Sequence, residues 1–204
     1  MTHDQTHGHS PSNGALPQDL FLLSDESLET VAARFKTDLE NGLAGKPSSL
    51  KLLKSHLRLS SGTESGHYLA LDFGGTNVRV THVNLDGARG YTLLGSRRVR
   101  LREARKDGQT LDLTTKETGA EALFDYIAQE IIPVARQMKT SLSGQNAIPL
   151  GHTFSFPYAA GHAGEARLIT WTKEIAVSGA VGQDINRLLR DALARLDASD
   201  IRPV

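Results

Sequence analysis

The stretch that decides the fold is "YLALDFGGTNVRV", which runs from Tyr68 to Val80. An apolar run ends at Asp72, two glycines and a Thr-Asn pair follow, and an apolar pattern then resumes. Two apolar runs separated by a short glycine turn predict a strand–turn–strand hairpin. Glycines lack a Cβ atom, so backbone N–H groups in such a turn can approach an anion closely. The stretch therefore predicts a phosphate site, with a purely structural hairpin as the alternative.

The side chains beside the two glycines suit phosphate chemistry. Asp72 stands at the end of a strand, where an exposed carboxylate can hold a magnesium ion through the water shell of the ion. Thr76 and Asn77 add a hydroxyl group and an amide donor, and Arg79 adds a cation suited to phosphate. These residue types together favour phosphate groups accompanied by Mg²⁺ as the ligand.

The composition describes an ordinary globular protein with one hydrophobic core. Of the 204 residues, 39% are hydrophobic and 23% are charged. The 23 Lys and Arg residues balance 23 Asp and Glu residues, so no net field attracts nucleic acid or an anionic membrane. The absence of cysteine excludes disulfides, iron–sulfur clusters and thiolate zinc sites. No segment resembles a membrane span or a signal peptide, so we expect a cytoplasmic protein with no nucleic acid and no membrane as partners.

The pattern around the hairpin predicts an α/β domain. Residues 1–17 are polar and rich in His, Ser and Gly, so we expect a disordered tail there and a domain over 18–204. The predicted elements are a helix from Ser24 or Asp25 to Gly42, strands over 68–72, 78–83 and 91–101, a helix starting near Glu121, a strand in "IPLGHTFSFP" ended by Pro157, and a helix over about 182–196. The order is β-β-β-α-β-α, and the final "IRPV" begins like a further strand.

Three details of these elements can be checked against a structure. The helix near Glu121 has an apolar face made of Leu123, Ile127, Ile131, Val134 and Met138. We expect Pro133 to bend or shorten that helix. The charged stretch "REARKDGQTLDLTTKETG", residues 102–119, is most simply a surface loop, and a second loop carries "LITWTKEI", residues 168–175.

The glycine turn resembles the first phosphate motif of the hexokinase family. Three further motifs, "GLAGKPSSLKLL", "PLGHTFSFP" and "LITWTKEIAVSGAVGQDINRLLRDALAR", occur in the order that hexokinases and glucokinases have, so the resemblance covers Leu20 to Val204. It implies the actin-like, ribonuclease-H-like ATPase fold, of which this chain would be the first, small domain. It also implies transfer of the γ-phosphoryl group of ATP, bound with Mg²⁺, to the 6-hydroxyl of glucose or another hexose.

The resemblance assigns roles to individual residues. Asp72 would organise the magnesium ion, and the phosphates of ATP would be lined by Gly74, Gly75, Thr76, Asn77 and Arg79. Ser155 would contact the sugar beside a wall of Phe156 and Pro157, and the sugar-contacting pair would be Thr172 and Lys173, with Lys173 in a supporting catalytic role. Read without the family, Ser155 is a strand-end hydroxyl bonded to backbone, Trp171 is core packing, and Lys173 is a solvated side chain.

The chain departs from the family pattern at four positions. The family usually has Gly-Phe after "WTK", whereas Glu174 and Ile175 follow it here, so a carboxylate stands beside the proposed sugar loop. His152 and Tyr158 replace the usual Phe and Cys around "TFSFP". We interpret the last two changes as repacking.

The sequence ends before the residue that acts as general base in hexokinases. That aspartate belongs to an "NDT" motif which follows a segment like "DIRPV", and Asp200 is better read as a surface turn residue. We therefore expect the N-terminal part of a hexokinase, truncated before the catalytic segment and inactive without a C-terminal hexokinase portion, in cis or from another chain. The alternatives are a non-catalytic sugar- or nucleotide-binding module or a degenerate hexokinase fragment; the sugar motifs argue against an unrelated actin-like domain.

Overall fold

The computed structural model describes residues 22–50, 52–53, 59–139, 147–161 and 164–203. The tail predicted over 1–17 lies outside the described residues. The chain divides into two compact units, Met1–Leu52 and Leu53–Val204, and each is described by itself.

The first unit contains one helix, α1 (Asp25–Leu43), among its described residues. Ser24 caps it as predicted, because the Ser24 hydroxyl accepts a hydrogen bond from the backbone N–H of Ser27 at 3.2 Å. The helix continues one residue past Gly42, the predicted stop, and Gly45 follows with a φ of 69°. No residue of α1 is buried, so its apolar side chains form an exposed face: Leu28, Val31 and Phe35.

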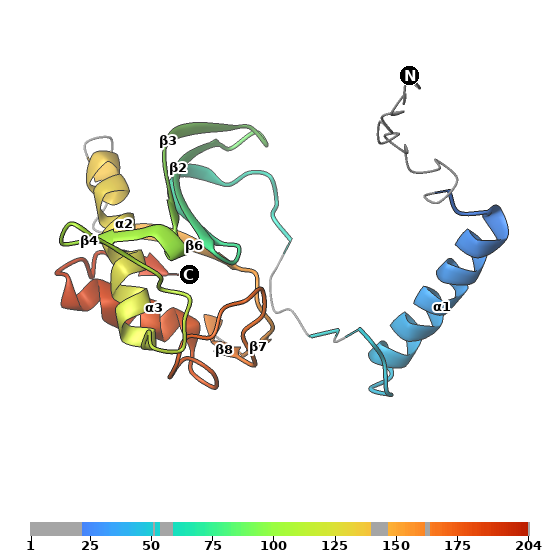
Figure 1. Cartoon of the computed structure of the whole chain (residues 1–204). Coiled ribbons are helices and arrows are strands. Elements are labelled where there is room, and N and C mark those ends of the chain that lie inside the picture. Colours follow the sequence, from blue (N-terminus) through green and yellow to red (C-terminus); the bar gives the residue numbers. More distant parts are fainter. Residues whose placement is uncertain (1–21, 51, 54–58, 140–146, 162–163, 204) are drawn as a thin grey trace, which may run out of the picture. The chain divides into compact units, whose positions relative to one another are not determined.

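The second unit is built on a five-stranded mixed sheet with strand order β3-β2-β1-β6-β9 (Figure 1). The first three strands are antiparallel neighbours: β1 (Ser65–Phe73), β2 (Asn77–Asp86) and β3 (Tyr91–Arg100). On the other side of β1, β6 (Ile148–Phe154) and β9 (Ile201–Pro203) run parallel to it. The predicted α/β order is confirmed, and "IRPV" does contribute a strand, at the edge of the sheet.

The core lies between the sheet and two helices. Alternate side chains of β1 are buried, as a strand with one covered face requires. The helix α2 (Ala120–Lys139) packs against β1, β2 and β3, and all five residues of its predicted apolar face are buried. The helix α3 (Ile185–Arg195) packs against α2 and β9 and begins at Asp184, whose carboxylate accepts from the backbone N–H of Asn186 at 3.1 Å.

Two expectations from the sequence are wrong, the first of them in part. Of the bend or shortening expected at Pro133, the shortening does not occur, because α2 continues for six residues to Lys139 and buries Val134 and Met138 beyond the proline. The stretch 102–119 is not simply a loop. It begins within the 3₁₀ turn η2 (Leu101–Glu103), and a hairpin of β4 (Ala104–Lys106) and β5 (Gln109–Leu111) follows.

The burial of two apolar residues explains this hairpin. Leu101 and Ala104 are both fully buried, and they fix the charged segment against the core. A second unpredicted hairpin, β7 (Tyr158–Ala160) with β8 (Ala166–Leu168), follows Pro157. It leads directly into the loop "LITWTKEI". None of the described helices is long and apolar enough to cross a membrane.

Candidate phosphate and sugar site

The glycine turn joins the end of β1 to the start of β2. The backbone N–H of Gly74 donates to the carbonyl of Asn77 at 3.2 Å, which closes the turn. Gly75 has a φ of 144°, a conformation that only glycine adopts without strain. A Cβ atom at Gly75 would also lie 3.2 Å from Cδ of Lys173. The second glycine is therefore required by its backbone conformation and by the close approach of the lysine.

A cavity of about 420 Å³ opens at this turn. It is lined by Gly74, Gly75, Thr76, Asn77, Arg102, Lys173 and Glu174. The lining residues come from three segments that are distant in sequence: the turn itself, η2, and the loop after β8. Two cations and one carboxylate give the lining a formal charge of +1, which suits an anion.

Lys173 connects this cavity to the predicted sugar wall. Its ammonium group donates to the carbonyl oxygen of Gly74 at 2.7 Å, and the same nitrogen lies 5.5 Å from the ring centroid of Phe156. The backbone of Lys173 has a φ of 57°, in the left-handed region that non-glycine residues rarely adopt. Both contacts are to protein groups, so the side chain is held between the phosphate turn and the aromatic wall.

Asp72 and Arg79 lie beside the cavity without lining it. Asp72 on β1 stands opposite Arg79 on β2 in the register of the two strands, and both residues are exposed. The Asp72 Oδ1 atom is 3.8 Å from the position that a Cβ atom on Gly74 would occupy. Among the described residues, no three His, Cys, Asp or Glu side chains are grouped so as to hold a metal ion. Because Mg²⁺ keeps several waters and needs only one or two carboxylates, Asp72 alone fits the role predicted for it.

The predicted sugar wall stands on an aromatic cluster. Phe156 is buried and lies 5.2 Å from Phe73, 4.8 Å from Phe154 and 4.9 Å from Trp171, measured between ring centroids. The indole N–H of Trp171 donates to the carbonyl of Val177 at 2.8 Å. Trp171 therefore packs against the aromatic cluster, as expected when the sequence is read without the family resemblance. This packing fixes the loop that carries Thr172 and Lys173.

The two predicted sugar-contacting hydroxyls belong to exposed residues around this cluster. The backbone N–H of Ser155 donates to the carbonyl of Phe73 at 3.0 Å, which holds Ser155 beside the end of β1. The carbonyl of Pro157 accepts a hydrogen bond from the backbone N–H of Ile169 at 2.9 Å. The carbonyl of Thr172 accepts one from the backbone N–H of Ile175 at 3.2 Å. These bonds fix the backbone on both sides of the wall.

Sequence analysis missed one pair of site residues. Nη2 of Arg102 lies 2.7 Å from Oε2 of Glu174, and both residues line the cavity. Arg102 fell in a stretch that we interpreted as a loop, and Glu174 stood out only as a departure from the family pattern. The two residues are 72 positions apart, so no periodicity or local motif could have paired them.

His152, which replaces the usual Phe, lies behind the sugar wall. Its Nδ1–H donates to the amide oxygen of Asn186 at 3.2 Å, and the amide nitrogen of Asn186 donates to the carbonyl of Gly164 at 2.7 Å. Burial lowers the pKa of His152 to about 4, so the ring is neutral at pH 7. Its Nε2 atom is buried and has no hydrogen-bond partner within the described part of the chain. His152 thus links β6 to α3, and Asn186 links α3 to the segment between β7 and β8.

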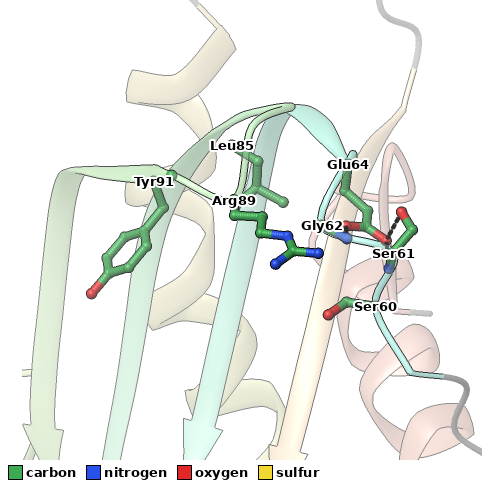
Figure 2. Close-up of a pocket in the computed structure, with 8 residues that line it drawn as sticks. Ser60, Ser61, Gly62, Glu64, Leu85, Arg89 and Tyr91 are labelled. Atoms are coloured by element: carbon green, nitrogen blue, oxygen red, sulfur yellow. Dashed lines mark hydrogen bonds between the residues drawn. The ribbon is translucent and has the colours of Figure 1, made fainter.

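A second cavity, of about 410 Å³, lies at the other end of β1 (Figure 2). Figure 2 shows the Arg89 side chain extending from the β2–β3 turn toward the segment that carries Ser60 and Gly62. Glu64 accepts from the backbone N–H groups of Ser61 and Gly62 at 2.7 and 2.9 Å, and these bonds lower its pKa to about 2. None of the predicted site residues lines this cavity.

Sequence comparison connects the chain to named proteins. The family model described as "Hexokinase" matches residues 17–204. Hexokinase-3 of Mus musculus is 36% identical over 185 residues, which are 90% of this chain and 18% of that protein. Hexokinase-1 of Schizosaccharomyces pombe is 33% identical over 91% of this chain and 36% of its own length. The chain thus spans between about a fifth and about a third of the length of these relatives.

Solved structures agree with the sequence comparison. A structure titled "Crystal structure of Hexokinase" has a TM-score of 0.72 and 31% identity, over 90% of this chain and 42% of that one. A hexokinase from Schistosoma mansoni, complexed with glucose, has a TM-score of 0.69 and 28% identity, over 89% and 39%. These structures have the actin-like ATPase fold, which confirms the fold expected from the sequence. With a family match over nearly all of its residues, the chain belongs to the hexokinase family.

Proposed function

We propose that this chain supplies the phosphate turn and one wall of the sugar site in an enzyme that phosphorylates glucose or a related hexose at its 6-hydroxyl, with ATP and Mg²⁺. The observation that carries the proposal is the position of Lys173. Its ammonium group contacts the Gly74 carbonyl in the phosphate turn and faces the Phe156 ring in the sugar wall. In the proposed enzyme this side chain would lie between the two substrates that a phosphoryl transfer must bring together.

The residues of the cavity suit the electrostatics of this reaction. The hexose oxygen forms a bond to the γ-phosphorus, and the bond from that phosphorus to the β–γ bridging oxygen breaks, so negative charge must be neutralised throughout. The backbone N–H groups around Gly75, with Thr76, Asn77 and Arg79, would bind the phosphates. Asp72 would hold hydrated Mg²⁺.

The proton of the hexose hydroxyl needs a base, and the predicted sugar contacts Ser155, Thr172 and Lys173 include no carboxylate. Glu174 is the one carboxylate among the described residues that line the cavity, and it lies with Arg102 at the phosphate turn. Asp200 lies 2.5 Å from the ammonium group of Lys139, whose hydrogen bond lowers the pKa of Asp200. We therefore assign the base to a C-terminal hexokinase portion, in cis or on another chain.

On the sugar side, the hydroxyls of Ser155 and Thr172 and the ammonium group of Lys173 would bind hexose hydroxyls. Such groups discriminate strongly, because a poor analogue leaves them without partners. The relative from Schistosoma mansoni, whose structure is titled as a complex with glucose, supports a hexose as the substrate.

The test is a glucose phosphorylation assay with MgATP, on the chain alone and after mixing with a C-terminal hexokinase fragment. We expect turnover only in the mixture, and loss of that turnover in Lys173→Met. Lys116→Met is the matched control, since Lys116 is exposed and does not line the cavity. Turnover by the chain alone would contradict the assignment of the base. A folded chain that stays inactive in the mixture would favour the second candidate, a non-catalytic sugar- or nucleotide-binding module.

A further inference from the structure

Two side chains of opposite charge meet at the phosphate cavity. Arg102, from η2, donates from Nη2 to Oε2 of Glu174 at 2.7 Å, and both residues line the cavity together with the glycine turn. The carboxylate of Glu174 therefore neutralises a cation that would otherwise face an incoming phosphate. A cavity whose proposed ligand is a polyanion contains a negative side chain of its own.

The local backbone gives no reason for a glutamate at this position. Glu174 has a φ of 62°, and the preceding Lys173 has a φ of 57°. Both lie in the left-handed region, which favours glycine. The ion pair with Arg102 is the contact that the structure gives the Glu174 carboxylate.

The exposure of this pair makes an exchange of partners easy. The side chains of Arg102 and Glu174 are 46% and 78% exposed, and ion pairs in such positions contribute little to stability. A guanidinium group binds phosphate oxygens in the same forked geometry that it uses for a carboxylate. A triphosphate carries more negative charge than one carboxylate, so it can displace Glu174 from the arginine. A singly or doubly charged anion competes less well.

We propose that Arg102 is a phosphate-binding residue of this cavity and that Glu174 holds it until a polyphosphate displaces the carboxylate. This inference rests on the proposed function, because it presupposes that the cavity binds phosphate. It adds a phosphate contact that lies outside the four sequence motifs. Glu174 lowers the affinity of the cavity for any phosphate ligand that uses Arg102, because the ion pair must open before the ligand binds.

The test uses the full chain and inorganic tripolyphosphate with Mg²⁺, which has the charges of the ATP tail and needs no adenine site. Isothermal titration calorimetry measures the affinities for tripolyphosphate and for orthophosphate. Both are compared among wild type, Glu174→Gln, Arg102→Gln and the double variant. We expect Glu174→Gln to bind tripolyphosphate about fivefold more tightly, because the ligand no longer has to open the ion pair, and orthophosphate by no larger factor. Arg102→Gln should weaken binding, and the double variant should bind about fivefold more weakly than Glu174→Gln.

Glu103→Gln is the matched control. Glu103 pairs with Arg100 at 3.2 Å, lies next to Arg102 in sequence and does not line this cavity, so its removal tests for a general effect of charge. Equal tightening by Glu103→Gln and Glu174→Gln would overturn the inference, and so would equal affinities of Glu174→Gln and the double variant. If wild type binds tripolyphosphate and Glu174→Gln binds no better, the inference fails while the proposed phosphate site stands. If no folded variant binds it, the phosphate site itself fails, and the inference with it.

Discussion

At the scale of single residues, Gly75 shows how one position serves both the backbone and the site. Its φ of 144° disfavours any other residue, and a Cβ atom there would lie only 3.2 Å from Cδ of Lys173. We expect Gly75→Ala to lower the free energy of unfolding by about 1–3 kcal/mol, measured by urea denaturation. Gly74→Ala is the control, because its Cβ would meet nothing closer than 3.8 Å. Equal losses for the two variants would contradict this account of the turn.

His152 predicts a pH dependence of stability. Burial lowers its pKa to about 4 in the folded chain, whereas the unfolded value is about 6.5. The unfolded state therefore binds more protons between these values, so this contribution to stability is complete above about pH 6.5 and is lost as the pH falls toward 4. The loss is at most about 3 kcal/mol.

The variant His152→Phe isolates this effect. It should flatten the dependence of the free energy of unfolding on pH between 4.5 and 6.5, measured by urea denaturation at several pH values. A smaller slope should remain, because burial also lowers the pKa of His82. An unchanged slope would show that His152 is not the titrating group.

At the scale of elements, an ion pair fastens the edge strand β3 to α2. Arg97 donates from Nε to Glu130, whose side chain is 10% exposed, while that of Arg97 is 49% exposed. Arg97→Met should cost about 1–2 kcal/mol in urea denaturation, because a nearly buried carboxylate loses its partner. Arg187→Met should cost less than about 0.5 kcal/mol, since Arg187 pairs with Asp191 on the surface of α3. A cost for Arg97→Met as small as for the control would mean that solvent replaces the arginine.

The elements that sequence could predict are those whose side chains repeat with a period. The apolar face of α2 was identified because five residues recur at helical spacing, and the hairpin of β1 and β2 because apolar runs flank two glycines. The helix continues past Pro133 because it is stabilised by buried neighbours rather than by local propensity.

The features that sequence could not predict depend on contacts between distant segments. The strands β4, β5, β7 and β8 have three residues each and form two separate two-stranded hairpins outside the main sheet, so neither a period nor the order of the main sheet pointed to them. The pair of Arg102 and Glu174 forms only when η2 and the loop after β8 meet at the glycine turn. The candidate site residues were predicted from ordered motifs, while the grouping of the glycine turn around Lys173 required the folded chain.

At the scale of the whole molecule, the proposed phosphate turn and the proposed sugar wall belong to one compact unit, Leu53–Val204. Trp171 is the one tryptophan of the chain, and it lies on the sugar side, in ring contact with Phe156 and two residues before Lys173. Its fluorescence can therefore report whether an event at the phosphate turn is transmitted to the sugar wall.

The measurement we would make is Trp171 fluorescence while tripolyphosphate with Mg²⁺ is titrated into the full chain. Because Lys173 contacts both Gly74 and Phe156, we expect a saturable change in wild type and in Lys116→Met. In Lys173→Met the half-saturating concentration should rise about tenfold or more, since the lining of the cavity loses one of its two cations. The same titration curve in Lys173→Met and wild type, or no response in any folded variant, would contradict a site in which Lys173 joins phosphate and sugar.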